Sequence, residues 1–421
     1  MPFQYDVFEF GAAGDGKTND AKVINSVIDA CAAAGGGTVY FPPGRFVSGT
    51  IHVKSNITID ISPGATVATS PDDDDIDELE DLPYNPEADA ETTYFNPSLF
   101  QFQGVENVCI KGGGTIDGNR RARLGPKPIA VKQCRRVTIR DVKVVNAPNY
   151  AVSFIDSEDI TVDNAWIDHA FADGIDFDGC RYARVSNCRV SSVDDAMCLK
   201  ASPAMGRPIN CEHILINNST FLTEYTAFKV GSETGPGDFL DVVMANCTLG
   251  RCAGLANHPG GITIESQDGA RVAGFAISNI AMHHIGTPVN IMIRNRGRAQ
   301  EVPVPGIVED ITINNLVALD AISGCSISGL PDRRARNISI DNVTIHLAEG
   351  AATGIEAAYA RWSGSSEFTR RACVFSCQHA EGVRVGNYHV IFSADGEGVE
   401  PVACLDDVDD CSIPAGELSS E

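Results

Sequence analysis

Short runs of alternating apolar and polar residues recur along most of the chain. Each run has two apolar or β-branched residues one position apart, followed by Asn or Asp and then another apolar residue. Alternation with a period of two is typical of β-strands that bury one face. The recurring polar residue stands at Asp141, Asn164, Asn187, Asn218, Asn246, Asn279, Asn315 and Asn342.

The intervals between these polar residues vary from 23 to 36 residues. A constant motif at variable spacing indicates strands of constant length joined by loops of changing length. Repeats of this size are typical of solenoids, and the intervals lack the long helical patterns that a βα-barrel needs. We therefore predict an all-β fold, a single parallel β-helix domain over residues 1–421. Stacked Asn side chains would hydrogen-bond to one another along the coil.

The two ends of the chain differ from this repeat. Residues 5–60 read as an opening segment of short strands and one helix, which Thr18 or Asn19 would cap and which would end at about Ala34. The helix would cover the open end of the first coil, where bare strand edges promote aggregation. Residues 350–421 are predicted to form the final coils and a C-terminal cap. The helical apolar positions are Val23, Ile24, Val27, Ile28 and Cys31.

Acidic residues outnumber basic ones by 56 to 32, which gives a formal net charge of −24. This charge disfavours nucleic acids and anionic membrane surfaces as partners. The chain also has no apolar run of 18 or more residues that would predict a transmembrane helix. Part of the acidic excess lies in residues 71–92, PDDDDIDELEDLPYNPEADAET. We interpret this insertion as a solvated loop, because it lacks the ligand spacing of an EF-hand calcium site.

The N-terminal residues MPFQYDVFEF lack the basic and apolar regions of a secretory signal peptide. Fourteen cysteines are scattered along the chain, without the paired CxxC motifs of a zinc site. Buried, reduced thiols are the simplest interpretation. We therefore predict a cytoplasmic protein that needs no metal and no other cofactor.

Residues 171–202, FADGIDFDGCRYARVSNCRVSSVDDAMCLKAS, combine the strand pattern with a group of acids. Asp173 and Asp194 are 21 residues apart, close to one predicted coil, and Asp195 follows directly. Adjacent strands would place these carboxylates roughly 5 Å apart, where like charges raise at least one pKa. Such a cluster can protonate the leaving oxygen of a glycosidic bond while other carboxylates activate water. A solvated turn is the usual role of a single Asp, but three at this spacing favour catalysis.

Charged residues on the later strands are candidate substrate ligands. Lys200 lies just after the Asp pair, and the following strands carry Lys229, Glu233, Glu265 and Arg294. A salt bridge between Lys229 and Glu265 on neighbouring coils would explain that pair equally well, and loop arginines such as Arg294 are often only solvated.

Two parts of the sequence resemble a known family. The segment FGAAGDGKTNDAKVINSVIDACAAAGGGTVYFPPG is similar to the opening of the pectate-lyase-like right-handed β-helix superfamily. ADGID, followed 21 residues later by VDDAMCLKAS, resembles the NTDGID and GDD signatures of the polygalacturonase family, glycoside hydrolase family 28. This resemblance, from about residue 5 to 345, implies a right-handed coil and hydrolysis of α-linked galacturonate and related pectic linkages, with inversion and without a metal. It implies that Asp194 is the general acid and that Asp173 and Asp195 hold the attacking water.

The sequence departs from the family pattern at two motifs. The GHG motif would fall near residues 225–227, where there is no histidine. The RIK motif, which binds the substrate carboxylate, would fall at residues 263–265, where the sequence is TIE. A glutamate there would repel a uronate. Either Lys229, Lys200 or the arginines near Arg294 bind the carboxylate, or the adjacent sugar is not a uronate, which indicates a divergent branch of the family.

The residues and the resemblance together predict a glycosidase of pectic or rhamnogalacturonan-type oligosaccharides that acts from a chain end. Three alternatives remain open. They are a hydrolase of a neutral α-linked sugar, a calcium-dependent polysaccharide lyase with an Arg or Lys base, and a non-catalytic carbohydrate-binding β-helix. A cytoplasmic location would favour short oligosaccharides over polymer as the substrate.

Overall fold

Parallel strands stack coil upon coil in a computed structural model that describes residues 4–120, 123–252, 259–348, 373–392, 403–414 and 417–420. The chain divides into two units, residues 1–220 and 221–421, each built from such stacked strands. The fold is the predicted all-β, right-handed parallel β-helix with an N-terminal helix. That the whole chain is one domain stays a prediction.

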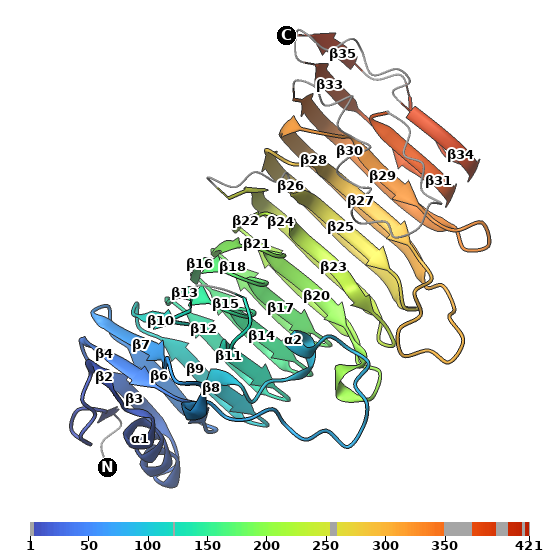
Figure 1. The fold of residues 1–421 in the computed structure, drawn as a ribbon. Coiled ribbons are helices and arrows are strands. Elements are labelled where there is room, and N and C mark those ends of the chain that lie inside the picture. The colour runs from blue at the N-terminus through green and yellow to red at the C-terminus, as the bar shows by residue number, and fades with distance from the viewer. Residues whose placement is uncertain are drawn as a thin grey trace. The chain divides into compact units, whose positions relative to one another are not determined.

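The strand pairings of the first unit form three parallel sheets, and each coil from β3 to β20 adds one strand to each sheet (Figure 1). Sheet A contains β1 (Gln4–Asp6), β3 (Gly37–Phe41), β6 (Ile57–Ile61), β9 (Glu106–Lys111), β12 (Arg135–Arg140), β15 (Glu158–Asp163), β18 (Arg181–Ser186) and β21 (Cys211–Asn217). Sheet B contains β2 (Asp15–Asn19), β4 (Gly44–Ser48), β7 (Ala65–Thr69), β10 (Thr115–Asp117), β13 (Lys143–Ala147), β16 (Trp166–Ala170) and β19 (Arg189–Ser192). Sheet C contains β5 (Ile51–Val53), β8 (Ser98–Gln103), β11 (Lys127–Lys132), β14 (Val152–Ile155), β17 (Ile175–Asp178) and β20 (Met197–Ala201).

Apolar side chains continue from coil to coil inside this unit. In sheet A, Ile160 pairs with Ala183, which pairs with Ile214, and all three are at most 1% exposed. Burying such an aliphatic side chain contributes about 1.5–3 kcal/mol. A slip of one residue would turn this row outward, so the alternating pattern fixes the register between coils.

The recurring Asn and Asp residues occupy a left-handed backbone turn, with φ from 49° to 58° at all eight positions. Asn and Asp tolerate this conformation better than other residues with a side chain, which gives a reason for their recurrence beyond the predicted ladder. Two side chains depart from the ladder: Asn187 donates to Asp163, and Asn342 donates to Asn314. Each acceptor lies one residue before the repeat position expected as the partner. The ladder itself joins Asn164 to Asp141, Asn279 to Asn246 and Asn315 to Asn279 at 2.8–3.0 Å.

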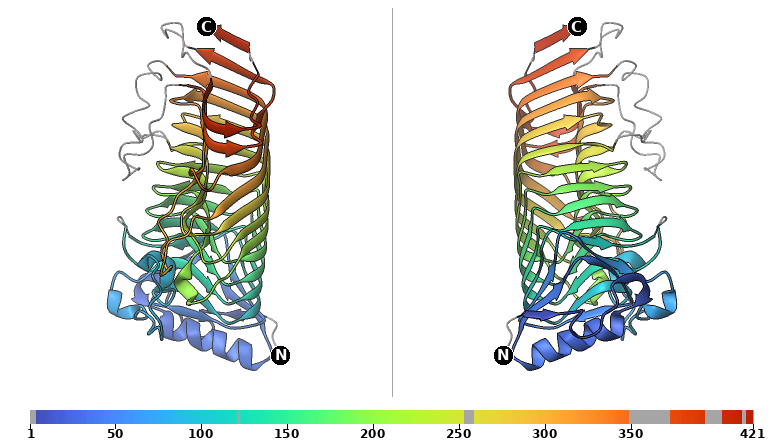
Figure 2. Two further views of the ribbon diagram at one scale, coloured as in Figure 1. Left: turned by 90° about the vertical axis from the view of Figure 1, so that its right-hand side faces the viewer. Right: turned by 90° about the vertical axis from the view of Figure 1, so that its left-hand side faces the viewer.

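Helix α1 (Ala21–Ala33) lies across the first coil of the first unit (Figure 2). It packs its buried face of Ile24, Val27, Ile28 and Cys31 against β3 and β5. Asp20 occupies the N-cap position, so the predicted cap was one or two residues too early. The Asp20 carboxylate accepts the backbone N–H groups of residues 13 and 14 instead of capping the helix.

The acidic insertion carries a short 3₁₀ turn, η1 (Asp73–Asp75), and a short helix, α2 (Ala90–Thr93). Its first residues are exposed, but Glu80 accepts the backbone N–H of Phe95 at 2.9 Å and pairs with Lys132 at 3.2 Å. Burial opposes ionisation of Glu80, yet the backbone hydrogen bonds and Lys132 lower its pKa. The insertion therefore returns to sheet C as an anchored segment.

The fourteen cysteines all lie in the described part of the chain as free thiols, and twelve of them are buried. Burial raises the pKa of Cys134 to about 11. A thiol with so high a pKa is inert, and it packs as a small apolar side chain.

The second unit has two parallel sheets with longer strands. Sheet D contains β23 (Thr226–Thr234), β25 (Gly260–Ser266), β27 (Thr287–Ile293), β29 (Cys325–Ser328), β31 (Phe375–Glu381) and β34 (Ala403–Asp409). Sheet E contains β24 (Phe239–Arg251), β26 (Arg271–His283), β28 (Ile307–Ala321), β30 (Ala335–Leu347), β33 (Tyr388–Phe392) and β35 (Glu417–Ser420). The remaining elements are β22 (Thr220–Thr223), β32 (Arg384–Val385) and η2 (Pro203–Met205).

The predicted final coils over residues 350–421 fall partly on β31 to β35. Residues 349–372, 393–402, 415–416 and 421 lie outside the described part of the chain. Among the described residues, no helix is both long and apolar enough to cross a membrane.

Candidate active site

The turns that precede β17 and β20 hold the three predicted catalytic aspartates. The two strands pair in parallel, and the pairing continues into the turns: Gly174 N–H donates to Asp195 O at 2.9 Å. Asp173 therefore lies directly beside Asp194 and Asp195, and one carboxylate oxygen of each lies within 4.8 Å of the other two. The convergence expected from the 21-residue spacing is thus present in the structure.

Burial distinguishes the three carboxylates. Asp173 is 4% exposed and Asp195 is 8% exposed, whereas the side chain of Asp194 keeps 20% of its surface in solvent. Burial raises the pKa of Asp173 well above its ordinary value of 3.8. Lys200 opposes this rise, and the charges of Asp194 and Asp195 add to it. Asp173 therefore binds a proton more readily than an ordinary aspartate does.

Lys200 is the cation that pairs with the buried carboxylates beside the cluster. Its Nζ lies 2.6 Å from Asp176 Oδ2 and 3.3 Å from Asp173 Oδ2, and it donates to Tyr150 Oη at 2.8 Å. Burial lowers the pKa of Lys200, but Asp176, Tyr150 and Asp173 outweigh it and raise the pKa well above the usual 10.5. Since Lys200 is 5% exposed, its direct partners are these protein groups.

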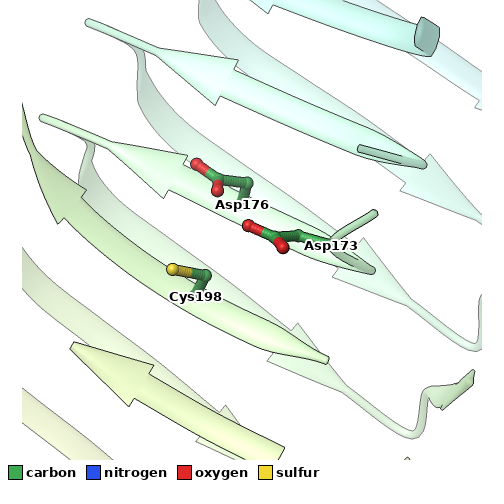
Figure 3. A group of neighbouring side chains, drawn as sticks. All are labelled: Asp173, Asp176 and Cys198. Carbon is green, nitrogen blue, oxygen red and sulfur yellow. The ribbon is translucent and has the colours of Figure 1, made fainter. Parts of the chain in front are cut away.

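Figure 3 shows a second group of possible metal ligands, in which Asp173 and Asp176 lie on one strand segment and Cys198 on the next. Their ligand atoms are within 4.8 Å of one another. The Lys200 ammonium already supplies positive charge to both carboxylates. Burial also raises the pKa of Cys198 well above 9.0, so the thiolate that a metal needs is unfavourable. These residues fit an ammonium better than a metal ion.

Arg123 and Glu91 complete the site, and neither was predicted from the sequence. Arg123 Nη1 donates to Asp194 Oδ2 at 2.6 Å, while its Nε and Nη2 donate to the two oxygens of Glu91 at 2.9 and 2.6 Å. Arg123 follows β10 in a loop, and Glu91 belongs to α2 of the acidic insertion. Neither belongs to the repeated motif. The available signal was a run of arginines, NRRAR at 119–123, in an otherwise acidic chain.

In the second unit, Lys229 and Glu265 form the salt bridge that was the structural alternative for this pair. Lys229 Nζ lies 2.8 Å from Glu265 Oε1, and both side chains are buried. Gln267 donates to the other oxygen of Glu265. The glutamate at the RIK position is therefore neutralised within the protein.

The other predicted ligands of the second unit have different environments. Glu233 is buried and pairs with Arg298 at 3.0 Å. Arg294 is half-buried, and its backbone N–H donates to Ser266 O at 2.8 Å. Its Nε is buried and finds no hydrogen-bond partner among the described residues. Substrate binding by Lys229, Glu233, Glu265 and Arg294 stays a prediction.

Related proteins indicate the family of this chain. The sequence pattern of the glycosyl hydrolases family 28 matches residues 48–357. The chain belongs to this family. It is 24% identical over 373 residues to a probable polygalacturonase of Vitis vinifera, which covers 82% of this chain and 74% of that protein. It is 22% identical to an exopolygalacturonase of Arabidopsis thaliana, over 75% of this chain and 72% of the relative.

The same fold is found in a solved structure of an exopolygalacturonase from Thermotoga maritima. The TM-score is 0.68 at 20% identity, over 82% of this chain and 87% of the other. The protein is therefore a family 28 glycosidase with a carbohydrate substrate and a right-handed β-helix fold.

Proposed function

We propose that this glycosidase hydrolyses α-linked galacturonides of pectic oligosaccharides from a chain end. The observation that carries the proposal is the cluster of Asp173, Asp194 and Asp195, with one oxygen of each within 4.8 Å, in a family 28 chain. Relatives named as polygalacturonase and exopolygalacturonase support the substrate and the exo mode.

The three carboxylates would have different catalytic roles according to their exposure to solvent. Asp194 is the most exposed and would donate its proton to the leaving glycosidic oxygen. Asp173 and Asp195 are buried and would hold one water molecule between them. The water oxygen attacks the anomeric carbon as the glycosidic C–O bond breaks, and the water proton passes to one of these two carboxylates.

The spacing of the carboxylates bears on the stereochemistry. Nearest oxygens within 4.8 Å are closer than the about 6.5–9.5 Å typical of inverting enzymes. Burial nevertheless argues against Asp173 or Asp195 as a covalent nucleophile, because a sugar carbon cannot approach them as closely as a water molecule can. We therefore propose water attack with inversion.

Three single variants test the roles. Asp173→Asn, Asp194→Asn and Asp195→Asn should each lower kcat on trigalacturonate by about 10²–10⁴-fold, the usual contribution of a general acid or base. The matched control is Asp168→Asn, which removes an exposed acid from the neighbouring β16. Circular dichroism and thermal unfolding would show that the variants fold. Full activity of Asp194→Asn would contradict the proposal.

A calcium-dependent lyase, the other enzyme class expected from the sequence, would use the same three carboxylates to hold a cation, and a chelator separates it from the glycosidase. A lyase would lose activity after dialysis against EDTA and would release an unsaturated product that absorbs ultraviolet light. The hydrolase would keep its rate and release only saturated sugars.

A further inference from the structure

We propose that Arg123 recognises the carboxylate of the substrate, and that it exchanges Asp194 for this carboxylate when a galacturonide binds. The inference rests on the proposed function and names the residue that would replace the missing RIK motif. Arg123 would thereby couple substrate recognition to release of the general acid.

The guanidinium of Arg123 has two edges with different partners. We call the edge that faces Glu91 the holding edge and the edge that faces Asp194 the exchangeable edge. Glu91 accepts two parallel hydrogen bonds from Nε and Nη2, the bidentate geometry that fixes a guanidinium in place. Asp194 accepts a single bond from Nη1. The side chain of Arg123 keeps 43% of its surface in solvent. A second carboxylate can therefore reach it without moving Glu91.

Two other cations of the first unit near this site, Lys200 and Lys127, are held inside the protein. Lys200 is 5% exposed and forms ion pairs with Asp173 and Asp176. Lys127 is 1% exposed and donates to the carbonyl oxygen of Tyr94. Burial lowers the pKa of Lys127 to about 7, so it is a weak cation at neutral pH.

In the second unit, Lys229 is buried against Glu265. Two of the lysines that the sequence suggested for the substrate carboxylate, Lys200 and Lys229, are therefore already in buried ion pairs. Arg123 combines a full charge, exposure to solvent and a fork geometry that fits carboxylates.

The exchange also supplies the proton that the reaction needs. Asp194 accepts the Arg123 bond as a carboxylate, whereas a general acid must carry a proton. Asp173 lies within 4.8 Å and, in its buried surroundings, holds a proton readily. When Arg123 turns to the substrate, the proton of Asp173 moves to Asp194. Asp173 becomes the carboxylate that holds water, with the Lys200 ammonium 3.3 Å from its Oδ2.

The first test compares trigalacturonate with the same oligosaccharide whose carboxyl groups are amidated. Arg123→Gln should raise KM for trigalacturonate by about 10–100-fold, the loss expected for a charge-assisted hydrogen bond. It should change KM for the amide less than about threefold, and Arg123→Lys should recover part of the acid preference. The control is Arg120→Gln, in the same loop, whose guanidinium pairs with Asp73 of the same insertion.

An equal effect of Arg123→Gln on both substrates would overturn the inference while leaving the proposed hydrolase intact. A wild-type protein that cleaves neither would overturn the proposed function, and a binding measurement then decides the role of Arg123. Asp194→Asn, which releases Arg123, should bind trigalacturonate about tenfold more tightly than the double variant Arg123→Gln/Asp194→Asn. Equal affinities would contradict the exchange.

Discussion

The buried and acidic surroundings of Asp173 make ionisation of its carboxyl unfavourable. It is 4% exposed, and its neighbours include three other aspartates as well as Lys200. Its folded pKa lies above the unfolded value near 3.8, so the folded state binds more protons than the unfolded state between these two values. Stability therefore falls as pH rises from 3.8 towards this raised value, so the Asp173 carboxyl makes the native state less stable at neutral pH than at about pH 3.

Asp173→Asn should for this reason stabilise the protein at pH 7 while it lowers kcat by about 10²–10⁴-fold. We expect the free energy of unfolding to rise by about 0.5–2 kcal/mol, the range of single stabilising substitutions. Lys200 keeps its partner Asp176 in this variant. Thermal unfolding at pH 7 and at about pH 3 measures the difference in stability between the variant and the wild type. This difference should shrink at about pH 3, where the wild-type carboxyl is protonated.

Asp178→Asn, at the end of the strand that follows Asp173, provides the matched control. The Asp178 carboxylate accepts the backbone N–H of Ser202 at 2.8 Å and also its hydroxyl, bonds that an amide cannot reproduce fully. This variant should lose about 1–3 kcal/mol. Destabilisation by Asp173→Asn at pH 7 as large as that by Asp178→Asn would contradict the account of Asp173.

At the level of elements, the site depends on the close approach of the turns before β17 and β20. A Cβ on Gly174 would lie 2.2 Å from Val190 Cγ1 and 2.5 Å from Ala196 O, so no larger residue fits without displacing a neighbour. Such a displacement would separate Asp173 from Asp194 and Asp195.

Gly174→Ala should cost about 1–3 kcal/mol of stability and lower kcat on trigalacturonate at least tenfold. The control, Gly104→Ala, lies in a turn of the same unit with φ +63° and no atom within 4 Å of the added Cβ. It should lose about 1–2 kcal/mol through the left-handed backbone alone, with kcat unchanged. Equal kcat in both variants would show that the turn spacing does not set the geometry.

The same elements explain what could be predicted from the sequence. Alternation and spacing predict the coil, because each strand must bury one face against the previous coil, and the convergence of Asp173 with Asp194 follows from that period. The positions of Arg123 and Glu91 could not be predicted, since they lie in the loop after β10 and in the short helix α2 of the insertion, which the strand period does not place. The hydrogen-bond partner expected for Asn187 was one residue away from the observed Asp163. The pattern fixes the turn but does not fix the rotation of the Asn187 side chain.

At the scale of the whole molecule, the net charge of −24 opposes a polyanionic substrate. Salt screens this repulsion, because the Debye length falls from about 30 Å at 0.01 M to about 10 Å at 0.1 M. We therefore expect kcat/KM on long polygalacturonate to rise several-fold between these ionic strengths. Trigalacturonate is short and interacts mainly with the cations near the site. Its kcat/KM should therefore rise less than that of the polymer, or fall. A strong decrease for the polymer would indicate an attractive field instead.

The most direct test of the central claim is proton NMR of the sugars released from trigalacturonate in real time. Hydrolysis by water held between Asp173 and Asp195 predicts monogalacturonate from one chain end, with the newly formed reducing end first seen as the β-anomer and only later equilibrating with the α-anomer. A first product in the α-form, an unsaturated sugar or an uncleaved substrate would contradict the account.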